Sequence, residues 1–145
     1  MSDTPDTISD ETWAALIDAA SEARDRAYAP YSDFPVGAAL LTTDGEIVPG
    51  CNIEIASIGA TTCAERNAIH QAVGAGHRSF KALCVITDID PPGAPCGICR
   101  QVLAEFCDHL PILLINPAGD RRHTTLDELL PMRFSGRDFL DHFEP

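Results

Sequence analysis

Positive charge is scarce in this chain of 145 residues. Its 10 lysines and arginines, among which Lys81 is the single lysine, stand against 22 aspartates and glutamates, so the formal net charge is −12. Proteins that bind nucleic acids usually present a surface rich in Lys and Arg and release counterions on binding. The charge balance therefore argues against a nucleic acid as partner and favours a small, uncharged substrate.

Long apolar segments are missing as well. A membrane-spanning helix needs roughly 20 apolar residues in succession, and no segment approaches that length, so no membrane partner is expected. Residues 1–10 are polar and acidic and lack the basic start and apolar core of a signal peptide; we expect them to form a flexible tail. The six cysteines are accordingly expected to stay reduced, in the cytoplasm.

The composition and the periodicity indicate one globular domain over residues 1–145. Hydrophobic residues make up 45% of the chain, and a chain of this size suffices for a single core. Residues 12–29 carry apolar side chains at helical spacing, with Ser9 or Asp10 as N-cap and Pro30 as the stop. The other expected elements are strands over 36–42, 46–53, 82–87, 112–115 and 122–124, and helices over 63–73, 96–106, 126–130 and from 136.

Two short segments at expected helix starts together supply three thiolates. They are residues 63–66 (Cys-Ala-Glu-Arg) and 95–99 (Pro-Cys-Gly-Ile-Cys). A structural zinc takes four protein ligands, whereas a catalytic zinc takes three and holds water at the fourth position. No histidine lies at ligand spacing from these cysteines. The pattern therefore predicts a catalytic zinc held by Cys63, Cys96 and Cys99.

Glu65 and Arg66 supply further chemistry next to the first cysteine. Glu65 points in a different direction around the helix from Cys63, so we expect it to move protons between water, a ring nitrogen and a departing amine. Arg66 is expected to donate a hydrogen bond to a ligand sulfur without contacting the metal itself. Arg66 and the free N–H groups at the two helix starts would offset the negative charge of the thiolates. Zinc would then lower the pKa of its bound water to about 7. This constellation is typical of zinc deaminases.

Simpler interpretations stand beside this one. Three cysteines also fit a structural zinc knuckle or, for residues 96–99, a redox pair, and a zinc-stabilised binding module would need no catalysis. Arg100 is a second candidate for a hydrogen bond to sulfur. The other three cysteines lie in apolar surroundings and are expected in the core: Cys51, Cys84 and Cys107.

From Ala29 to Pro131 the chain resembles the small cytidine deaminases whose zinc ligands are all cysteines. Residues 29–37 (Ala-Pro-Tyr-Ser-Asp-Phe-Pro-Val-Gly) and the two cysteine motifs carry the resemblance. It implies a three-layer α/β/α fold with a mixed five-stranded sheet. It also implies one Zn²⁺ per subunit, Glu65 as proton shuttle, and hydrolytic deamination of cytidine and 2′-deoxycytidine to the uridine products plus ammonia, as in pyrimidine salvage.

The resemblance also assigns the residues that bind the substrate. The Asn-x-Glu motif that holds the ribose 3′-hydroxyl in this family corresponds to Asn52 and Glu54, which would otherwise be expected at a strand end facing solvent. Phe34 resembles the aromatic residue that packs against the pyrimidine ring, and Ala64 completes the set.

The family is typically homotetrameric, with pockets that borrow residues from neighbouring subunits. Tyr31 and Phe134 resemble such borrowed groups. Two departures lie in residues 54–58, where relatives often have Glu-Asn-Ala followed by an aromatic residue: this chain has Ile55 and Ile58. Ile58 cannot donate a hydrogen bond toward a sugar hydroxyl. Because substrate discrimination depends on pairing such groups, the alternative substrate is a modified cytosine nucleoside, including a nucleoside antibiotic such as blasticidin S.

Overall fold

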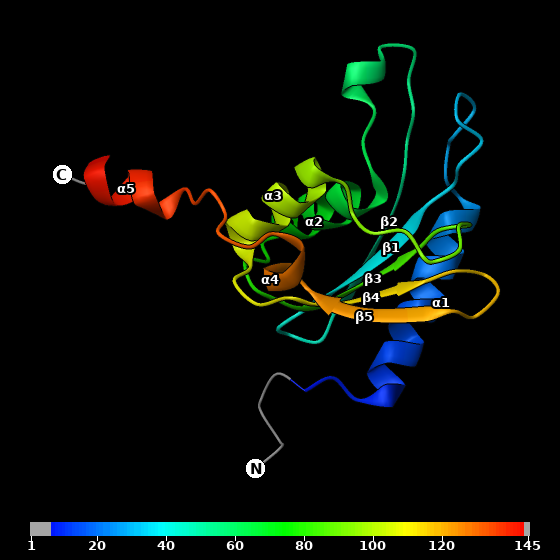
Figure 1. Ribbon diagram of the computed structural model, residues 1–145, viewed down its shortest axis with the longest axis horizontal. Helices are drawn as coiled ribbons and strands as arrows, with labels where there is room; N and C mark the ends of the chain where they lie inside the picture. Colours follow the sequence, from blue (N-terminus) through cyan, green and yellow to red (C-terminus); the bar gives the residue numbers. More distant parts are fainter. Residues whose placement is uncertain (1–6, 144–145) are drawn as a thin grey trace.

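The structure is a computed structural model that describes residues 7–143 (Figure 1). Its centre is a five-stranded sheet in the order β2-β1-β3-β4-β5. β3 and β4 run parallel, whereas the other neighbouring strands are antiparallel, which confirms the expected mixed sheet. The strands are β1 (Gly37–Thr42), β2 (Ile47–Cys51), β3 (Phe80–Ile86), β4 (Pro111–Ile115) and β5 (Arg121–Thr125).

Helices cover both faces of this sheet, so the expected three layers are present (Figure 1). α1 (Asp10–Asp25) packs on one face, and α2 (Ala64–Gly74) and α3 (Gly97–Phe106) lie on the other. α3 connects the parallel strands β3 and β4, as a crossover must. The smaller elements are η1 (Ile58–Ala60), α4 (Leu126–Leu129) and α5 (Arg137–Phe143).

Strand β1 shows how the apolar sequence forms two cores. Ala38 and Leu40 belong to the core beneath α2 and α3, whereas Ala39 and Leu41 belong to the core beneath α1. Successive side chains of a strand point to opposite faces, so a continuous apolar run is what a sheet covered on both sides requires. Every residue of β1 is buried as a result.

The first helix has the expected N-cap but ends earlier than expected. It begins at Asp10, and the Ser9 hydroxyl oxygen caps it by accepting from the Thr12 amide at 3.1 Å. It ends at Asp25 instead of continuing to residue 29, because Tyr28 leaves helical geometry to pair with Ile53, with the Tyr28 amide donating to Asn52 O at 3.0 Å. Ser9 and Asp10 are therefore not tail residues; residues 1–6 lie outside the described part.

The expected hairpin is confirmed between β1 and β2. Gly45 in its turn has φ +91°, a left-handed conformation that glycine adopts without strain. Gly50 in β2 meets the start of α2 so closely that a Cβ atom there would lie 2.5 Å from Ala64 O and 2.5 Å from Ala68 N. This contact fixes the start of α2 against the sheet.

Between residues 7 and 143, no helix combines the length and the apolar character needed to cross a membrane.

Candidate metal centre and active site

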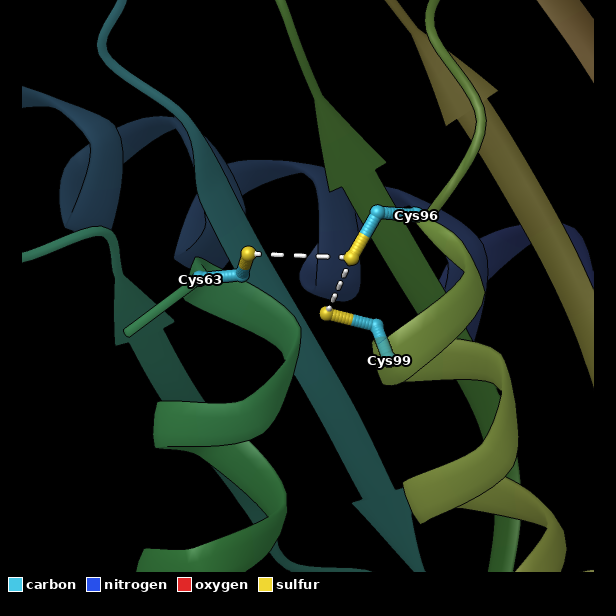
Figure 2. Close-up of side chains that lie close together, drawn as sticks. All are labelled: Cys63, Cys96 and Cys99. Atoms are coloured by element: carbon cyan, nitrogen blue, oxygen red, sulfur yellow. Dashed lines mark hydrogen bonds between the residues drawn. The ribbon is translucent and has the colours of Figure 1, made fainter. Parts of the chain in front are cut away.

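The starts of α2 and α3 lie next to each other and direct three thiols toward one point (Figure 2). Cys63 is the N-cap residue of α2 and Cys96 that of α3, and both have extended backbone conformations; Cys99 lies in the first turn of α3. The Sγ atoms of Cys63 and Cys96 are 3.9 Å apart, and those of Cys96 and Cys99 are 3.5 Å apart. All three sulfur atoms lie within 4.8 Å of one another.

This spacing suits zinc. Four ligands around a tetrahedral zinc with Zn–S bonds of about 2.3 Å place their sulfur atoms about 3.8 Å apart. Among residues 7–140, whose side chains the structure describes, the cluster contains no fourth His, Cys, Asp or Glu ligand, so one vertex would remain open, as in a catalytic site. Free N–H groups at the two helix starts favour the anionic sulfur atoms that zinc requires.

Arg66 and the neighbouring thiols change the acidity of Cys63. The pKa of Cys63 is lowered to about 5, first because the neighbouring Cys99 thiol favours the thiolate form, and then because Arg66 adds a hydrogen bond and a positive charge. Arg66 Nη2 lies 3.5 Å from Cys63 Sγ and also donates to Thr61 O at 3.3 Å. The interaction with Cys63, together with burial, raises the pKa of Cys99. The expected contact between Arg66 and a ligand sulfur is therefore present.

Glu65 lies in the first turn of α2 and is buried, with 5% of its surface exposed. Burial raises the pKa of its carboxyl to about 7, and the negative charge of Cys63 acts in the same direction. The Glu65 amide and the charge of Arg66 partly oppose this rise. A carboxyl with this pKa exchanges a proton readily near neutral pH, which suits a general acid and base.

A cavity of about 320 Å³ joins these groups to the predicted substrate-binding residues. Its volume falls within the range of small-molecule sites, about 300–1,000 Å³. Ser32, Thr61 and Thr87 line it too, and no sequence signal pointed to these three. The predicted site residues in its wall are Phe34, Asn52, Glu54, Cys63, Ala64, Glu65 and Cys96.

Glu54 lies in the wall of this cavity and is 8% exposed. Its carboxylate accepts from the amides of Tyr31 at 2.9 Å and Ser32 at 3.1 Å, and from the Ser32 hydroxyl. The Ser32 hydroxyl is the largest of the influences that lower the pKa of Glu54, and the two amides contribute in the same direction. Glu54 is thus an ionised acceptor that also holds the loop bearing Tyr31.

Asn52 holds the segment that carries Phe34. Its Oδ1 accepts from the Val36 amide at 2.8 Å, and its Nδ2 donates to Phe34 O at 2.9 Å. The amide group therefore serves the protein itself in this structure, and its role in binding ribose stays a prediction, as does that of Glu54.

The two groups expected from a neighbouring subunit lie elsewhere on the chain. Tyr31 is 60% exposed and lines an adjacent cavity of about 250 Å³, together with Ile55 and Ile58. Phe134 is 65% exposed, contacts Phe139 edge to face, and belongs to neither cavity. It precedes α5, which extends away from the sheet (Figure 1).

Two sequence-based expectations about other residues differ from the structure. The Arg100 guanidinium donates to the carbonyl oxygens of Pro95 and Leu129, not to a sulfur, because its position on α3 directs it to main chain. Cys51 is only partly buried at the end of the edge strand β2. Cys84 and Cys107 are buried as expected, and burial raises the pKa of each thiol to about 12.

The fold and the site together define a class of enzyme. Three converging thiols with an open vertex, beside a buried carboxyl that titrates near neutral pH, form a zinc centre suited to hydrolysis.

Comparisons with known proteins identify the family. The family described as "Cytidine and deoxycytidylate deaminase zinc-binding region" matches residues 10–113. The "Cytidine deaminase" of Sporosarcina psychrophila is 54% identical over 124 residues, 85% of this chain and 91% of that one. The crystal structure of cytidine deaminase from Burkholderia pseudomallei superposes with a TM-score of 0.81 at 50% identity, covering 83% of this chain and 98% of that one. The chain belongs to the cytidine and deoxycytidylate deaminase family.

A less similar relative has a different name. The "Blasticidin-S deaminase" of Bacillus cereus is 32% identical over 108 residues, 69% of this chain and 76% of that protein. The family match and the three-thiol cluster together support zinc as the cofactor.

Proposed function

We propose that this enzyme hydrolyses cytidine and 2′-deoxycytidine to uridine and 2′-deoxyuridine, releasing ammonia. The observation that carries the proposal is one cavity that brings Glu65 and two of the cysteines together with Asn52 and Glu54. Its metal end suits attack on an amidine-like carbon, and Glu54 offers an anionic acceptor to a sugar hydroxyl. The cytidine deaminase relatives support this substrate.

The residues of the metal end divide the chemistry among them. Cys63, Cys96 and Cys99 would hold zinc, which when bound supplies a Lewis acid that makes water a nucleophile near neutral pH. Water adds its oxygen to C4 of the pyrimidine. Glu65 carries one proton from the water to ring nitrogen N3 and a second to the amino group, which leaves as ammonia. Arg66 stabilises the thiolate of Cys63 by its hydrogen bond.

The substrate end of the cavity fits a nucleoside. Phe34 and Ala64 line the same cavity as Glu65 and would contact the pyrimidine ring. The Glu54 carboxylate has lone pairs beyond those used by its contacts with the loop, and these would accept from a ribose hydroxyl. The second N–H of Asn52 Nδ2 would add a donor. Salvage of pyrimidine nucleosides is the corresponding cellular role, and zinc-binding thiols favour the reducing cytoplasm.

We further infer a homotetramer in which neighbouring subunits complete each pocket. Apolar side chains of Tyr31, Ile58 and Phe134 are exposed on segments that a single chain leaves without cover, with exposed fractions of 60%, 75% and 65%. Tyr31 and Ile58 line one cavity together with Ile55, and exposed apolar groups that gather in this way mark interaction surfaces. Tyr31 and Phe134 would thereby reach the substrate of an adjacent subunit.

A modified cytosine nucleoside is the second candidate substrate. The 250 Å³ cavity lined by Ile55 and Ile58 shares Ser32, Glu54 and Thr61 with the main cavity. It would accommodate an apolar substituent on the sugar, whereas the retained Glu54 favours an ordinary ribose.

Ammonia release from a nucleoside panel tests the proposal. We expect cytidine and 2′-deoxycytidine to be deaminated faster than 5′-modified cytosine nucleosides, by a protein that holds one zinc per chain. Light scattering of the same preparation is expected to give four times the 15.6 kDa chain mass. Activity in metal-free protein, or faster turnover of a 5′-modified nucleoside, contradicts the proposal; a monomeric active enzyme contradicts the shared pockets.

A further inference from the structure

Arg100 contacts the main chain immediately before the metal ligand Cys96. Its Nε donates to Pro95 O at 2.7 Å, and its Nη1 donates to Leu129 O, at the end of α4, at 2.7 Å. Its main-chain amide donates to Cys96 O at 3.0 Å. We propose that Arg100 is a positioning residue, which fixes Cys96 at the zinc centre by clamping the preceding main chain to α4.

Cys96 is the metal ligand that most needs such support. It is exposed and follows residues 87–95, which form neither helix nor strand. Cys99, by contrast, is fully buried within α3. Cys63 follows Thr62, which pairs with Ile53 in a β-bridge. The backbone on the N-terminal side of Cys96 therefore has no hydrogen-bond ladder of its own.

Side chains that directly follow β3 and β4 hold the first part of this loop in place. The Thr87 hydroxyl accepts from the Gly93 amide at 2.8 Å, and Asn116 Nδ2 donates to Ile89 O at 3.1 Å. These contacts order the first part of the loop. The carbonyl of Pro95, directly before Cys96, is held by Arg100. Arg100 therefore holds the last part of the loop, directly before the ligand Cys96.

The chemistry of the contact requires arginine. A guanidinium group presents several N–H donors in a rigid fork, so one side chain can hold two carbonyl groups in fixed directions. Hydrogen bonds from an ionised donor are about twice as strong as neutral ones. A lysine at this position could reach one of the two carbonyls but would not fix their relative position.

Two other arginines provide matched controls. Arg78 Nη1 donates to Val73 O at 2.8 Å and His77 O at 2.9 Å, at the far end of α2. Arg133 donates to Leu130 O and Cys107 O, and so holds the chain after α4 without touching the Pro95 loop. Each would lose comparable carbonyl contacts on substitution by Gln.

Zinc transfer from the holoenzyme to a chromogenic chelator tests the inference, which rests on the proposed zinc site. Loss of groups that orient metal ligands typically weakens metal binding 10- to 100-fold. We expect Arg100→Gln to release zinc about tenfold faster than the unsubstituted enzyme, and Arg100→Lys to restore part of the difference. Arg78→Gln and Arg133→Gln should release zinc at the unsubstituted rate. Cobalt-substituted Arg100→Gln should show a shifted ligand-field spectrum.

The outcomes separate this inference from the proposed function. If the unsubstituted protein holds no zinc, the proposed function fails. If it holds zinc and Arg100→Gln releases the metal at the same rate, only the role of Arg100 is overturned. Equal acceleration by Arg133→Gln would also overturn it, because the effect would then arise from the C-terminal segment. If Arg100→Gln does not fold, the comparison of Arg100→Lys with the unsubstituted enzyme decides in the same way.

Discussion

The starts of α2 and α3 use the same backbone arrangement for different purposes. Each begins with a cysteine at the N-cap position, Cys63 at φ −71° and Cys96 at φ −68°. Each has an arginine within its first turns. Arg66 donates to a sulfur, however, whereas Arg100 donates to carbonyl groups. The start of α2 thus combines its ligand with a proton carrier, Glu65, and a positive charge, Arg66. The start of α3 combines its ligand with a second ligand, Cys99, and an arginine that holds the main chain.

The difference follows from how each helix start is held. Gly50 lets β2 pack directly on the first turns of α2, with no room for a Cβ atom. That contact fixes Cys63, so Arg66 remains free to contact the metal ligands. The start of α3 arrives from an irregular loop, and Arg100 is used to secure it. At the start of α2, packing positions the ligand, so the neighbouring arginine is available to stabilise the thiolate. At the start of α3, the arginine is needed to hold the main chain.

Removing a ligand from the start of α3 should have the largest effect. Cys96→Ala is expected to lose zinc and all measurable deamination. Because metal binding links segments distant in sequence, it should also lower the melting temperature, by about 10 °C for a chain of this size. Metal analysis, ammonia release and calorimetry check this. Cys51→Ala, which changes a partly buried thiol outside the trio, should keep zinc; unchanged zinc in Cys96→Ala would contradict the site.

Removing the carboxyl from the start of α2 should affect turnover alone. Glu65→Gln is expected to lower kcat about 10²- to 10⁴-fold, the usual contribution of general acid–base catalysis. Zinc content and melting temperature should stay unchanged, because the substituted side chain replaces a buried carboxyl by a neutral amide of the same shape. Glu105→Gln, on the exposed side of α3, is the control. Retained turnover in Glu65→Gln would favour a zinc-stabilised binding module instead.

The position of the metal-binding residues at two helix starts could be predicted from the sequence. The spacing of the cysteines and the apolar periodicity after them placed both motifs at helix starts, because ligand spacing and helix patterns are local signals. The end of α1 was predicted wrongly, since the pairing of Tyr28 with Ile53 is a long-range contact. The role of Arg100 was missed for the same reason: its partner Leu129 is adjacent only in the folded chain.

Exposure at the edge of the sheet was equally hard to infer. Cys51 and Cys84 both lie in apolar sequence, yet Cys84 belongs to a central strand and is fully buried, whereas Cys51 ends an edge strand and is partly exposed. A strand's place in the sheet depends on its pairing, which the local sequence does not specify. Ser32 was missed as a wall residue because its contact with Glu54 also joins separate segments.

Of the substitutions expected to lower turnover, Arg66→Gln should have the smallest effect, and it tests the difference between the two arginines. Arg66→Gln removes a 3.5 Å hydrogen bond to Cys63 and a positive charge beside it. A hydrogen bond from a charged group contributes about 1.5 kcal/mol at the low end, so kcat per bound zinc should fall about tenfold. Zinc release should change less than in Arg100→Gln, because Cys63 is held by the packing of α2 on β2.

Measuring kcat per zinc and zinc release for both variants separates the two roles. Arg100→Gln is expected to release zinc faster with little change in kcat per bound zinc, and Arg66→Gln is expected to do the reverse. Arg66→Lys, which keeps the positive charge, should recover part of the rate. If both variants lose zinc and turnover in the same proportion, then the two arginines have one common function and the distinction between the helix starts is wrong.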